Sequence, residues 1–214
     1  KLSAGLTDTG TAGGTVGLSV AGGLPTRNFQ EGSFEGAEKI SGQTMRDTIL
    51  ADRDTCYACP IRCKRVVKAE SPHKVDPRLG GPEYETIGSL GSSLGIDDLV
   101  AVAKGNELCN AYGLDTISTG VSIAFAMECF EKGLLTLEDT GGIEMRFGNA
   151  KAMLKSIDLI KSREGFGDFL ALGVREMAKR LGPEAEEIAM HVRGQEIPMH
   201  EPRLKYALGI GYAL

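Results

Sequence analysis

The sequence predicts a mainly α-helical (all-α) multihelical fold, with an irregular glycine-rich N-terminal segment and an extended C-terminal segment. Between residues 99 and 181, apolar residues recur mostly at steps of three and four, and glycine ends most of these stretches. The chain has 214 residues, of which 42% are hydrophobic, so it can bury a substantial core.

The first 82 residues carry few helical signals. Residues 1–23 contain seven glycines and no helical period, which predicts irregular backbone or short extended pieces. Ser41 is expected to cap a short helix that includes residues 45–50, and residues 64–70 are expected to form a strand. Residues 71–82 hold three prolines and two glycines and should form a loop.

The remaining chain should be helical up to residue 181 and extended near its end. Capping residues and glycine stops predict helices from Asp97 or Asp98 to Gly113 and from Asp115 or Thr116 to Gly133. Two further amphipathic helices are predicted over residues 147–161 and 169–181. Residues 192–202, with one glycine and two prolines, are expected to be extended.

Composition excludes several classes of function. The net charge is −5, from 29 acidic and 24 basic residues, which argues against nucleic acid as a partner. No stretch approaches 18 consecutive apolar residues, so no membrane span is expected. Three of the five cysteines crowd into eight positions, which is more typical of metal binding in a reducing cytoplasm than of secreted disulfides.

The crowded cysteines are Cys56, Cys59 and Cys63, spaced C-x2-C-x3-C. Thiolates this close form a chelating array, and the third cysteine favours an iron–sulfur cluster over zinc, although zinc or free thiols stay open. Cys109 and Cys129 lie on apolar helix faces and are expected in the core. The motif therefore supplies three ligands, and the chain offers no clear fourth.

Five motifs in order resemble the aldehyde:ferredoxin oxidoreductase family of tungsten, less often molybdenum, bis-pterin enzymes. They are Leu-Pro-Thr-Arg-Asn-Phe-Gln at 24–30, the cysteine motif, Gly-Pro-Glu-Tyr-Glu-Thr at 81–86, Asn-Ala-Tyr-Gly-Leu-Asp-Thr-Ile-Ser at 110–118, and Gly-Gln-Glu-Ile-Pro-Met-His-Glu-Pro-Arg at 194–203. The resemblance implies that residues 1–190 are a helical middle domain and that residues 191–214 begin the C-terminal domain. The chain is then a fragment, lacking parts at both ends and inactive alone.

The resemblance also implies cofactor ligands. Cys56, Cys59 and Cys63 would hold a [4Fe–4S] cluster whose fourth cysteine lies beyond Leu214. A pterin-binding motif, D-x-x-G-L-D, corresponds to Asn110, Gly113, Leu114 and Asp115. Asparagine in place of the leading aspartate loses the charge-assisted part of a hydrogen bond to the pterin.

For catalysis, the resemblance points to a glutamate near the metal and to His200. We favour Glu83 over Glu85 for the first role, which is to take a proton from the attacking water, while His200 polarises the carbonyl. Arg27 and Arg203 could contact pterin phosphates or structural carboxylates, and the sequence does not separate these.

The implied reaction is oxidation of an aldehyde to a carboxylic acid, with electrons leaving through the cluster to ferredoxin. The implied partners are ferredoxin, an aldehyde substrate and the missing domains of the same protein, and a homo-oligomer stays open. Two alternatives also stay open: a family member acting on another substrate, such as an activated aromatic acid, and a non-catalytic module that binds zinc.

Overall fold

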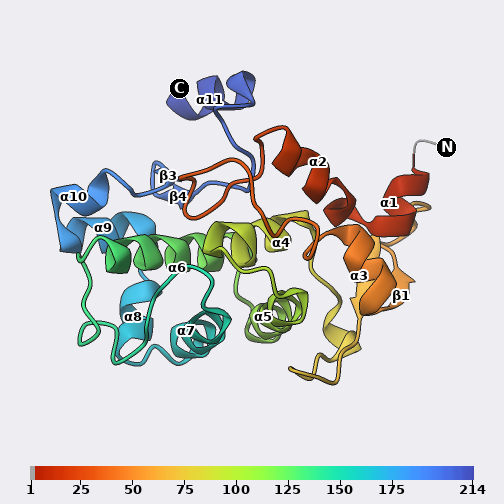
Figure 1. Ribbon diagram of the computed structural model, residues 1–214, viewed down its shortest axis with the longest axis horizontal. Coiled ribbons are helices and arrows are strands. Elements are labelled where there is room, and N and C mark those ends of the chain that lie inside the picture. The colour runs from red at the N-terminus through yellow and green to blue at the C-terminus, as the bar shows by residue number, and fades with distance from the viewer. Residues whose placement is uncertain (1–2) are drawn as a thin grey trace.

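A computed structural model describes residues 3–214, which fold mainly into α-helices, as the sequence predicts (Figure 1). The helices are α1 (Ala4–Thr9), α2 (Thr15–Val20), α3 (Gly42–Thr48), α4 (Tyr84–Leu90), α5 (Leu99–Tyr112), α6 (Thr116–Glu131), α7 (Ala150–Ser162), α8 (Phe166–Leu170), α9 (Val174–Leu181), α10 (Pro183–Glu186) and α11 (Tyr206–Ala213). Short 3-10 turns are η1 (Thr11–Gly14), η2 (Pro77–Leu79) and η3 (Ser92–Leu94). The strands form two antiparallel hairpins, β1 (Leu50–Asp54) with β2 (Lys64–Val67) and β3 (His191–Val192) with β4 (Gln195–Glu196).

Helix α6 is the centre of the core. Every residue from Thr119 to Cys129 is buried, because α4, α7, α8 and α9 all pack against this helix (Figure 1). A helix buried on all sides carries no polar face, and α6 is accordingly apolar or small-sided along most of its length. Gly120 lets α4 approach closely, since a Cβ there would lie 2.5 Å from the carbonyl oxygen of Ser89.

The predicted ends of α5 and α6 are confirmed. The Asp98 carboxylate accepts hydrogen bonds from the amides of Val100 and Ala101, and Gly113 ends α5 with a left-handed φ of 70°. The Asp115 carboxylate then accepts from the Ser118 amide and caps α6. These caps satisfy N–H groups that the helix itself leaves free, so a local signal is enough to place them.

The expectation of irregular or extended backbone over residues 1–23 is wrong for the described residues 3–23, which form α1, η1 and α2. Tertiary packing stabilises these short helices despite their glycines. At Gly42, a Cβ would lie 2.4 Å from the Thr9 carbonyl oxygen, so α3 lies directly against the turn that follows α1. Glycine here permits close approach, and that contact is not visible in local sequence.

The single helix predicted over residues 169–181 is also wrong, because the chain forms α8 and α9 with a break at Gly173. Gly173 has a left-handed φ of 79°. The buried Glu196 carboxylate accepts a hydrogen bond of 2.9 Å from the Val174 amide and so caps α9 from a distant segment. In a continuous helix the Val174 amide would donate to a backbone carbonyl of the preceding turn, and here the Glu196 carboxylate takes the place of that acceptor.

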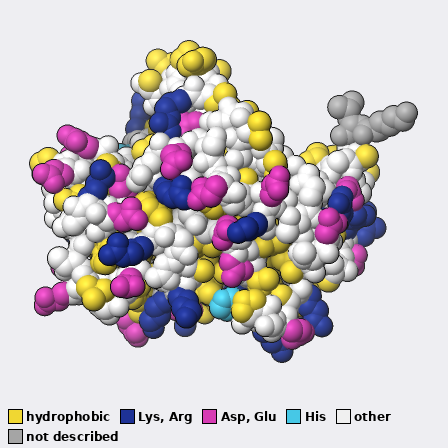
Figure 2. Space-filling view, viewed as in Figure 1, with side chains coloured by type: hydrophobic (Ala, Val, Ile, Leu, Met, Phe, Trp, Pro, Cys, Tyr) yellow, Lys and Arg dark blue, Asp and Glu magenta, His cyan; other side chains and the backbone are white. Residues whose placement is uncertain are grey.

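Two strands flank the cysteine loop. The strand predicted over residues 64–70 is β2, which ends at Val67 and pairs with β1. The predicted helix after Ser41 is α3, which ends at Thr48, so that Leu50 belongs to β1. The cysteines therefore occupy residues 55–63, the connection of a β-hairpin. Residues 192–202 are largely extended, as predicted, before α11, which carries exposed apolar side chains at the top of the molecule (Figure 2).

Candidate functional site

The cysteine loop begins with a tight turn. The Cys59 amide donates a hydrogen bond of 3.0 Å to the Cys56 carbonyl, which makes C-x2-C the four residues of a β-turn. Ala58, at the third position of this turn, has a left-handed φ of 56°, and Arg62, just before Cys63, has the same φ. The turn brings the first two cysteines together in the backbone, and a second reversal leads to the third.

All five cysteines are free thiols, but they fall into two environments. Cys56 is exposed and Cys59 and Cys63 are half-buried, whereas Cys109 and Cys129 are completely buried. Burial raises the pKa of the Cys109 and Cys129 thiols to about 12, which keeps them protonated and makes them poor metal ligands. The prediction that these two belong to the core is confirmed.

Three accessible thiols on one loop suit an iron–sulfur cluster or zinc by the chemistry of the donor set. Within residues 3–214, no three Cys, His, Asp or Glu side chains converge closely enough to hold a metal as they stand. Loading would therefore require side-chain rotation within the loop and a further donor. That Cys56, Cys59 and Cys63 bind a metal stays a prediction.

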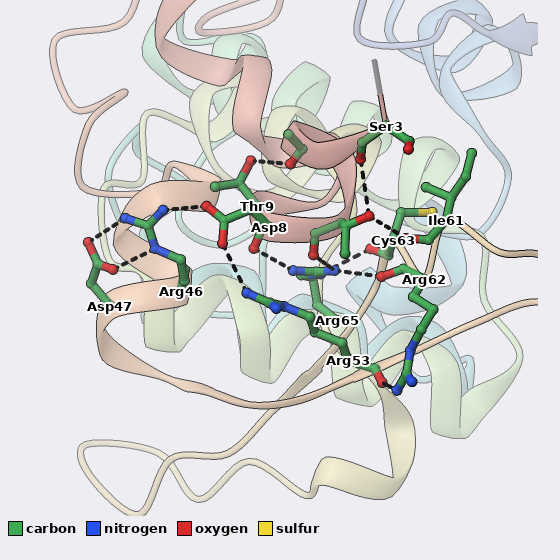
Figure 3. A network of polar contacts seen from close by, with 12 residues as sticks. Ser3, Asp8, Thr9, Arg46, Asp47, Arg53, Ile61, Arg62, Cys63 and Arg65 are labelled. Atoms are coloured by element: carbon green, nitrogen blue, oxygen red, sulfur yellow. Dashed lines mark hydrogen bonds and ion pairs between the residues drawn. The ribbon is translucent and has the colours of Figure 1, made fainter. Parts of the chain in front are cut away.

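A buried arginine fixes the base of this loop (Figure 3). Arg65, on β2, is only 2% exposed. Its guanidinium donates to the carbonyls of Cys63 and Arg62 at 3.0 Å each, and to those of Asp8 at 2.8 Å and Thr7 at 3.0 Å. One side chain thus joins the end of α1 to the third cysteine.

Two other arginines surround this contact. Asp8 accepts from Arg46 at 2.5 Å and from Arg53 at 2.9 Å, so its carboxylate bridges α3 and β1 (Figure 3). The Thr7 hydroxyl donates a 2.6 Å hydrogen bond to the Ile61 carbonyl. The glycine-rich N-terminal segment is therefore part of the cysteine site.

Glu83 lies at the start of α4 and accepts a hydrogen bond from the Thr11 hydroxyl. The same Thr11 oxygen accepts from the Tyr84 amide at 2.8 Å, so Thr11 caps the helix in place of Glu83. Glu83 lines a cavity of about 390 Å³ that Arg65 and Asn110 also line. The structure thus brings one predicted catalytic residue and one predicted pterin residue to a single cavity beside the cysteine hairpin.

His200 is joined to Glu85. Its Nε2 lies 3.1 Å from a Glu85 carboxylate oxygen, and its Nδ1 lies 2.8 Å from the Lys205 ammonium. Since the Lys205 ammonium can only donate, Nδ1 of His200 accepts its hydrogen bond. Nε2 therefore carries the ring proton and donates a hydrogen bond to the Glu85 carboxylate. Burial lowers the pKa of His200, Glu85 opposes this and Lys205 adds to it.

Two contacts hold the His200 segment against α4. The His200 ring stacks on Tyr84 with centroids 5.3 Å apart, and the Tyr84 hydroxyl donates to the Met199 carbonyl at 2.6 Å. The Met199 amide donates to the second Glu85 oxygen at 2.8 Å. Glu85 therefore binds both the His200 ring and the Met199 backbone, whereas Glu83 binds Thr11.

Three of the four predicted pterin residues line cavities, and the fourth, Gly113, forms the turn between them. Asn110 donates to the Leu79 carbonyl at 2.8 Å and lines the cavity of Glu83. Leu114 and Asp115 line another cavity of about 440 Å³, beyond the turn at Gly113. Asp115 uses one carboxylate oxygen to cap α6 at 2.7 Å. Their contact with a pterin stays a prediction.

Arg27 and Arg203 both face carboxylates. Arg27 pairs with Glu31 at 3.1 Å and with Glu35, and Arg203 pairs with Glu201 at 2.7 Å. Of the two roles that the sequence leaves open, these ion pairs favour contact with structural carboxylates over contact with pterin phosphates.

The sequence missed Arg65 and Lys205. Strand alternation could have signalled Arg65, because Val67, two residues on, shares its buried face of β2. No local pattern signals Lys205. Within residues 3–214, none of the helices combines the length and apolarity that crossing a membrane requires.

Comparison with known proteins assigns the family. The family described as "Aldehyde ferredoxin oxidoreductase, domains 2 & 3" matches residues 1–214. A tungsten-containing aldehyde ferredoxin oxidoreductase of Pyrococcus abyssi is 43% identical over 192 residues, which cover 88% of this chain and 31% of that protein. One of Thermococcus kodakarensis is 44% identical, with 88% and 30% covered. The chain therefore spans about a third of the length of the curated relatives it matches.

Two more distant matches broaden the comparison. A Pyrococcus furiosus protein named aliphatic sulfonate oxidoreductase, WOR-like subunit, is 32% identical over 96% of this chain and 34% of its own length. The fold is shared with the active site complex BamBC of benzoyl coenzyme A reductase, at a TM-score of 0.64 and 23% identity, covering 86% of this chain and 27% of that one. On the full-length profile match, this chain belongs to the aldehyde ferredoxin oxidoreductase family.

Proposed function

We propose that the chain is part of a tungsten–pterin enzyme that oxidises aldehydes to carboxylic acids and passes the electrons to ferredoxin. Family membership and the names of the relatives at 43% and 44% identity support the tungsten chemistry and the aldehyde substrate. The observation that carries the electron path is the set of three free thiols on one hairpin loop. Molybdenum in place of tungsten would leave the roles of these residues unchanged.

Cys56, Cys59 and Cys63 would hold a [4Fe–4S] cluster, with the fourth donor supplied from another part of the protein. The loop suits this role because its thiols are accessible and its backbone is already turned. The position of the loop at one end of the molecule, beside α1 and β1, suits transfer to an external acceptor (Figure 1). We assign the complete enzyme to the cytoplasm on its reduced cysteines.

Oxidation of an aldehyde consumes one water and releases two electrons and two protons. A bound tungsten–pterin group would supply the two-electron oxidation. Glu83, in the cavity beside Asn110, would take a proton from the water, and His200 would polarise the carbonyl through the Nε2 proton that it now donates to Glu85. Asn110, Gly113, Leu114 and Asp115 would contact the pterin.

Activity of the complete enzyme tests these assignments. Glu83→Gln or His200→Gln should lower kcat by about 10²–10⁴-fold, the usual contribution of a general acid or base. Glu176→Gln, which removes an exposed carboxylate paired with Lys179, should leave kcat unchanged. Full activity in both site variants would refute the catalytic roles. The chain of residues 1–214 alone should not oxidise aldehydes, and activity from it would show that the domain assignment is wrong.

Metal analysis of the complete enzyme tests the cluster. Iron and acid-labile sulfide near four per chain are expected, together with tungsten. Stoichiometric zinc without sulfide would favour the alternative of a structural zinc module. If the enzyme turned over a sulfonate or an activated aromatic acid faster than aldehydes, the proposed family chemistry would stand but the proposed aldehyde substrate would be wrong. The relative named as a sulfonate oxidoreductase makes a sulfonate the first alternative substrate to test.

A further inference from the structure

The buried guanidinium of Arg65 carries a positive charge. Within residues 3–214, every hydrogen-bond acceptor of this guanidinium is a backbone carbonyl, and no Asp or Glu forms an ion pair with it. The neighbouring carboxylate of Asp8 is already bridged between Arg46 and Arg53. Arg65 is therefore a buried cation whose hydrogen-bond partners are all neutral.

Such a charge is costly. A buried guanidinium loses its hydration, and carbonyl dipoles replace this only in part. An arginine side chain nevertheless stays protonated in proteins. Glu83, which lines the same cavity, accepts a hydrogen bond from Thr11 and forms no ion pair with Arg65. A methionine or leucine could fill the same volume without this cost. The charge calls for an anion close by.

The cysteine loop is the candidate anion. Arg65 donates from Nε to the Cys63 carbonyl and from Nη2 to the Arg62 carbonyl, so its charge lies against the backbone that carries the third cysteine (Figure 3). A [4Fe–4S] cluster with thiolate ligands is negatively charged, and one-electron reduction makes it more so. Net charge and hydrogen bonding around the cluster set its reduction potential.

We propose that Arg65 is the charge-compensating and positioning residue of the cysteine site, and that its cation raises the reduction potential of the cluster. This rests on the proposed function, because it requires the three cysteines to hold a cluster. The carbonyl contacts fix Cys63 in place, and the buried charge stabilises the reduced cluster over the oxidised one.

The first test is the midpoint potential of the cluster in the complete enzyme, measured by EPR-monitored redox titration. Arg65→Gln should lower the midpoint potential by about 59 mV. At a fixed applied potential, this shift lowers the ratio of reduced to oxidised cluster about tenfold. Arg65→Lys keeps the charge and should stay near the wild-type value. Arg62→Gln removes the same charge from an exposed side chain next to Cys63 and should shift the potential much less, because solvent screens it.

A second pair of variants keeps Arg65 in place. A Cβ at Gly10 would lie 3.0 Å from Arg65 Nε and 3.1 Å from the Cys63 carbonyl oxygen, and the φ of 65° with ψ of −167° there is a backbone conformation that glycine adopts almost exclusively. Aspartate and asparagine would share this strain equally, so the difference between them reports the charge. Gly10→Asp would give Arg65 a carboxylate partner, while Gly10→Asn has the same size without the charge. The aspartate variant should have the lower potential of the two. This pair decides the question if Arg65→Gln fails to fold.

The outcomes separate the two proposals. Equal potentials in Gly10→Asp and Gly10→Asn, or in Arg65→Gln and Arg62→Gln, would overturn the role of Arg65 while the cluster stands. Zinc without sulfide in the wild-type enzyme would overturn the proposed function, and the redox role of Arg65 with it.

Discussion

The cysteine hairpin and the helical core hold the same type of residue in opposite settings. Cys56, Cys59 and Cys63 sit on an accessible loop whose fixed points are polar contacts to backbone carbonyls. Cys109 and Cys129 sit on α5 and α6, where apolar packing excludes solvent. In the core a thiol acts as a small apolar group, whereas on the loop it is available for chemistry. The degree of burial therefore decides which of the cysteines are available to bind a metal.

The largest expected difference between the regions is in packing. Phe125, fully buried at the centre of α6, should cost about 3–5 kcal/mol of unfolding free energy when replaced by alanine, because the cavity does not close. Tyr57→Ala, on the fully exposed tip of the cysteine turn, should change stability by less than about 0.5 kcal/mol. Urea unfolding measures both. Comparable losses in the two variants would show that the cysteine turn is packed as tightly as the helical core.

The second difference is in pH dependence. Burial raises the pKa of Cys109 and Cys129 from 9.0 to about 12, so the folded state holds their protons more tightly than the unfolded state does. The contribution of these two protonated thiols to the free energy of unfolding is therefore complete below pH 9 and is lost as the pH rises toward 12. At pH 10 each thiol should cost about 1.4 kcal/mol relative to pH 8.

Cys129→Ala isolates one of these thiols. The loss of unfolding free energy between pH 8 and pH 10 should be smaller in this variant than in the wild type by one thiol's share. An unchanged difference would mean that the buried thiol does not carry the pH dependence.

The third difference is in the tolerance of a methyl group. Gly120→Ala would place Cβ against the Ser89 backbone and should cost about 1–3 kcal/mol by separating α4 from α6. Gly17→Ala in α2, outside the helical core, meets nothing within 4 Å and should be neutral or stabilise by about 0.5–1 kcal/mol. Thermal or urea unfolding compares them, and equal effects would show that α4 and α6 can adjust.

The smallest difference uses one substitution at two sites. Ala58→Gly relieves a left-handed alanine but adds unfolded-state entropy, so stability should change by less than about 0.5 kcal/mol. Ala101→Gly, inside α5 and buried, should cost about 1 kcal/mol. Unfolding midpoints measure both, and a larger loss at Ala58 would mean that the turn is less strained than its backbone indicates.

The sequence predicts the fold best where the signal is local. The caps at Asp98 and Asp115 and the stop at Gly113 depend only on neighbouring residues, so α5 and α6 begin and end where expected. The break at Gly173 depends on Glu196, and the helicity of residues 3–23 depends on contacts with α3 and the cysteine loop. Local patterns do not contain such information.

The same division holds for the candidate site. The spacing of the cysteines is a local feature, and their position on one turned loop follows from it. The pairing of His200 with Glu85, and the four carbonyl contacts of Arg65, join segments that lie far apart in sequence. They become visible only when the chain is folded.

The contact between Glu85 and Met199 spans 114 residues of sequence, and helices α5 to α10 lie within the loop it closes. Closing so long a loop has an entropic cost that the packed helices must already have met. We therefore expect the segment carrying His200 to dock late in folding, after its partner helix is in place. It should also detach first in the native state, so the Met199 amide should exchange with solvent before the amides of α6 do. A Met199 amide protected as strongly as α6 would instead make this segment part of the cooperative core.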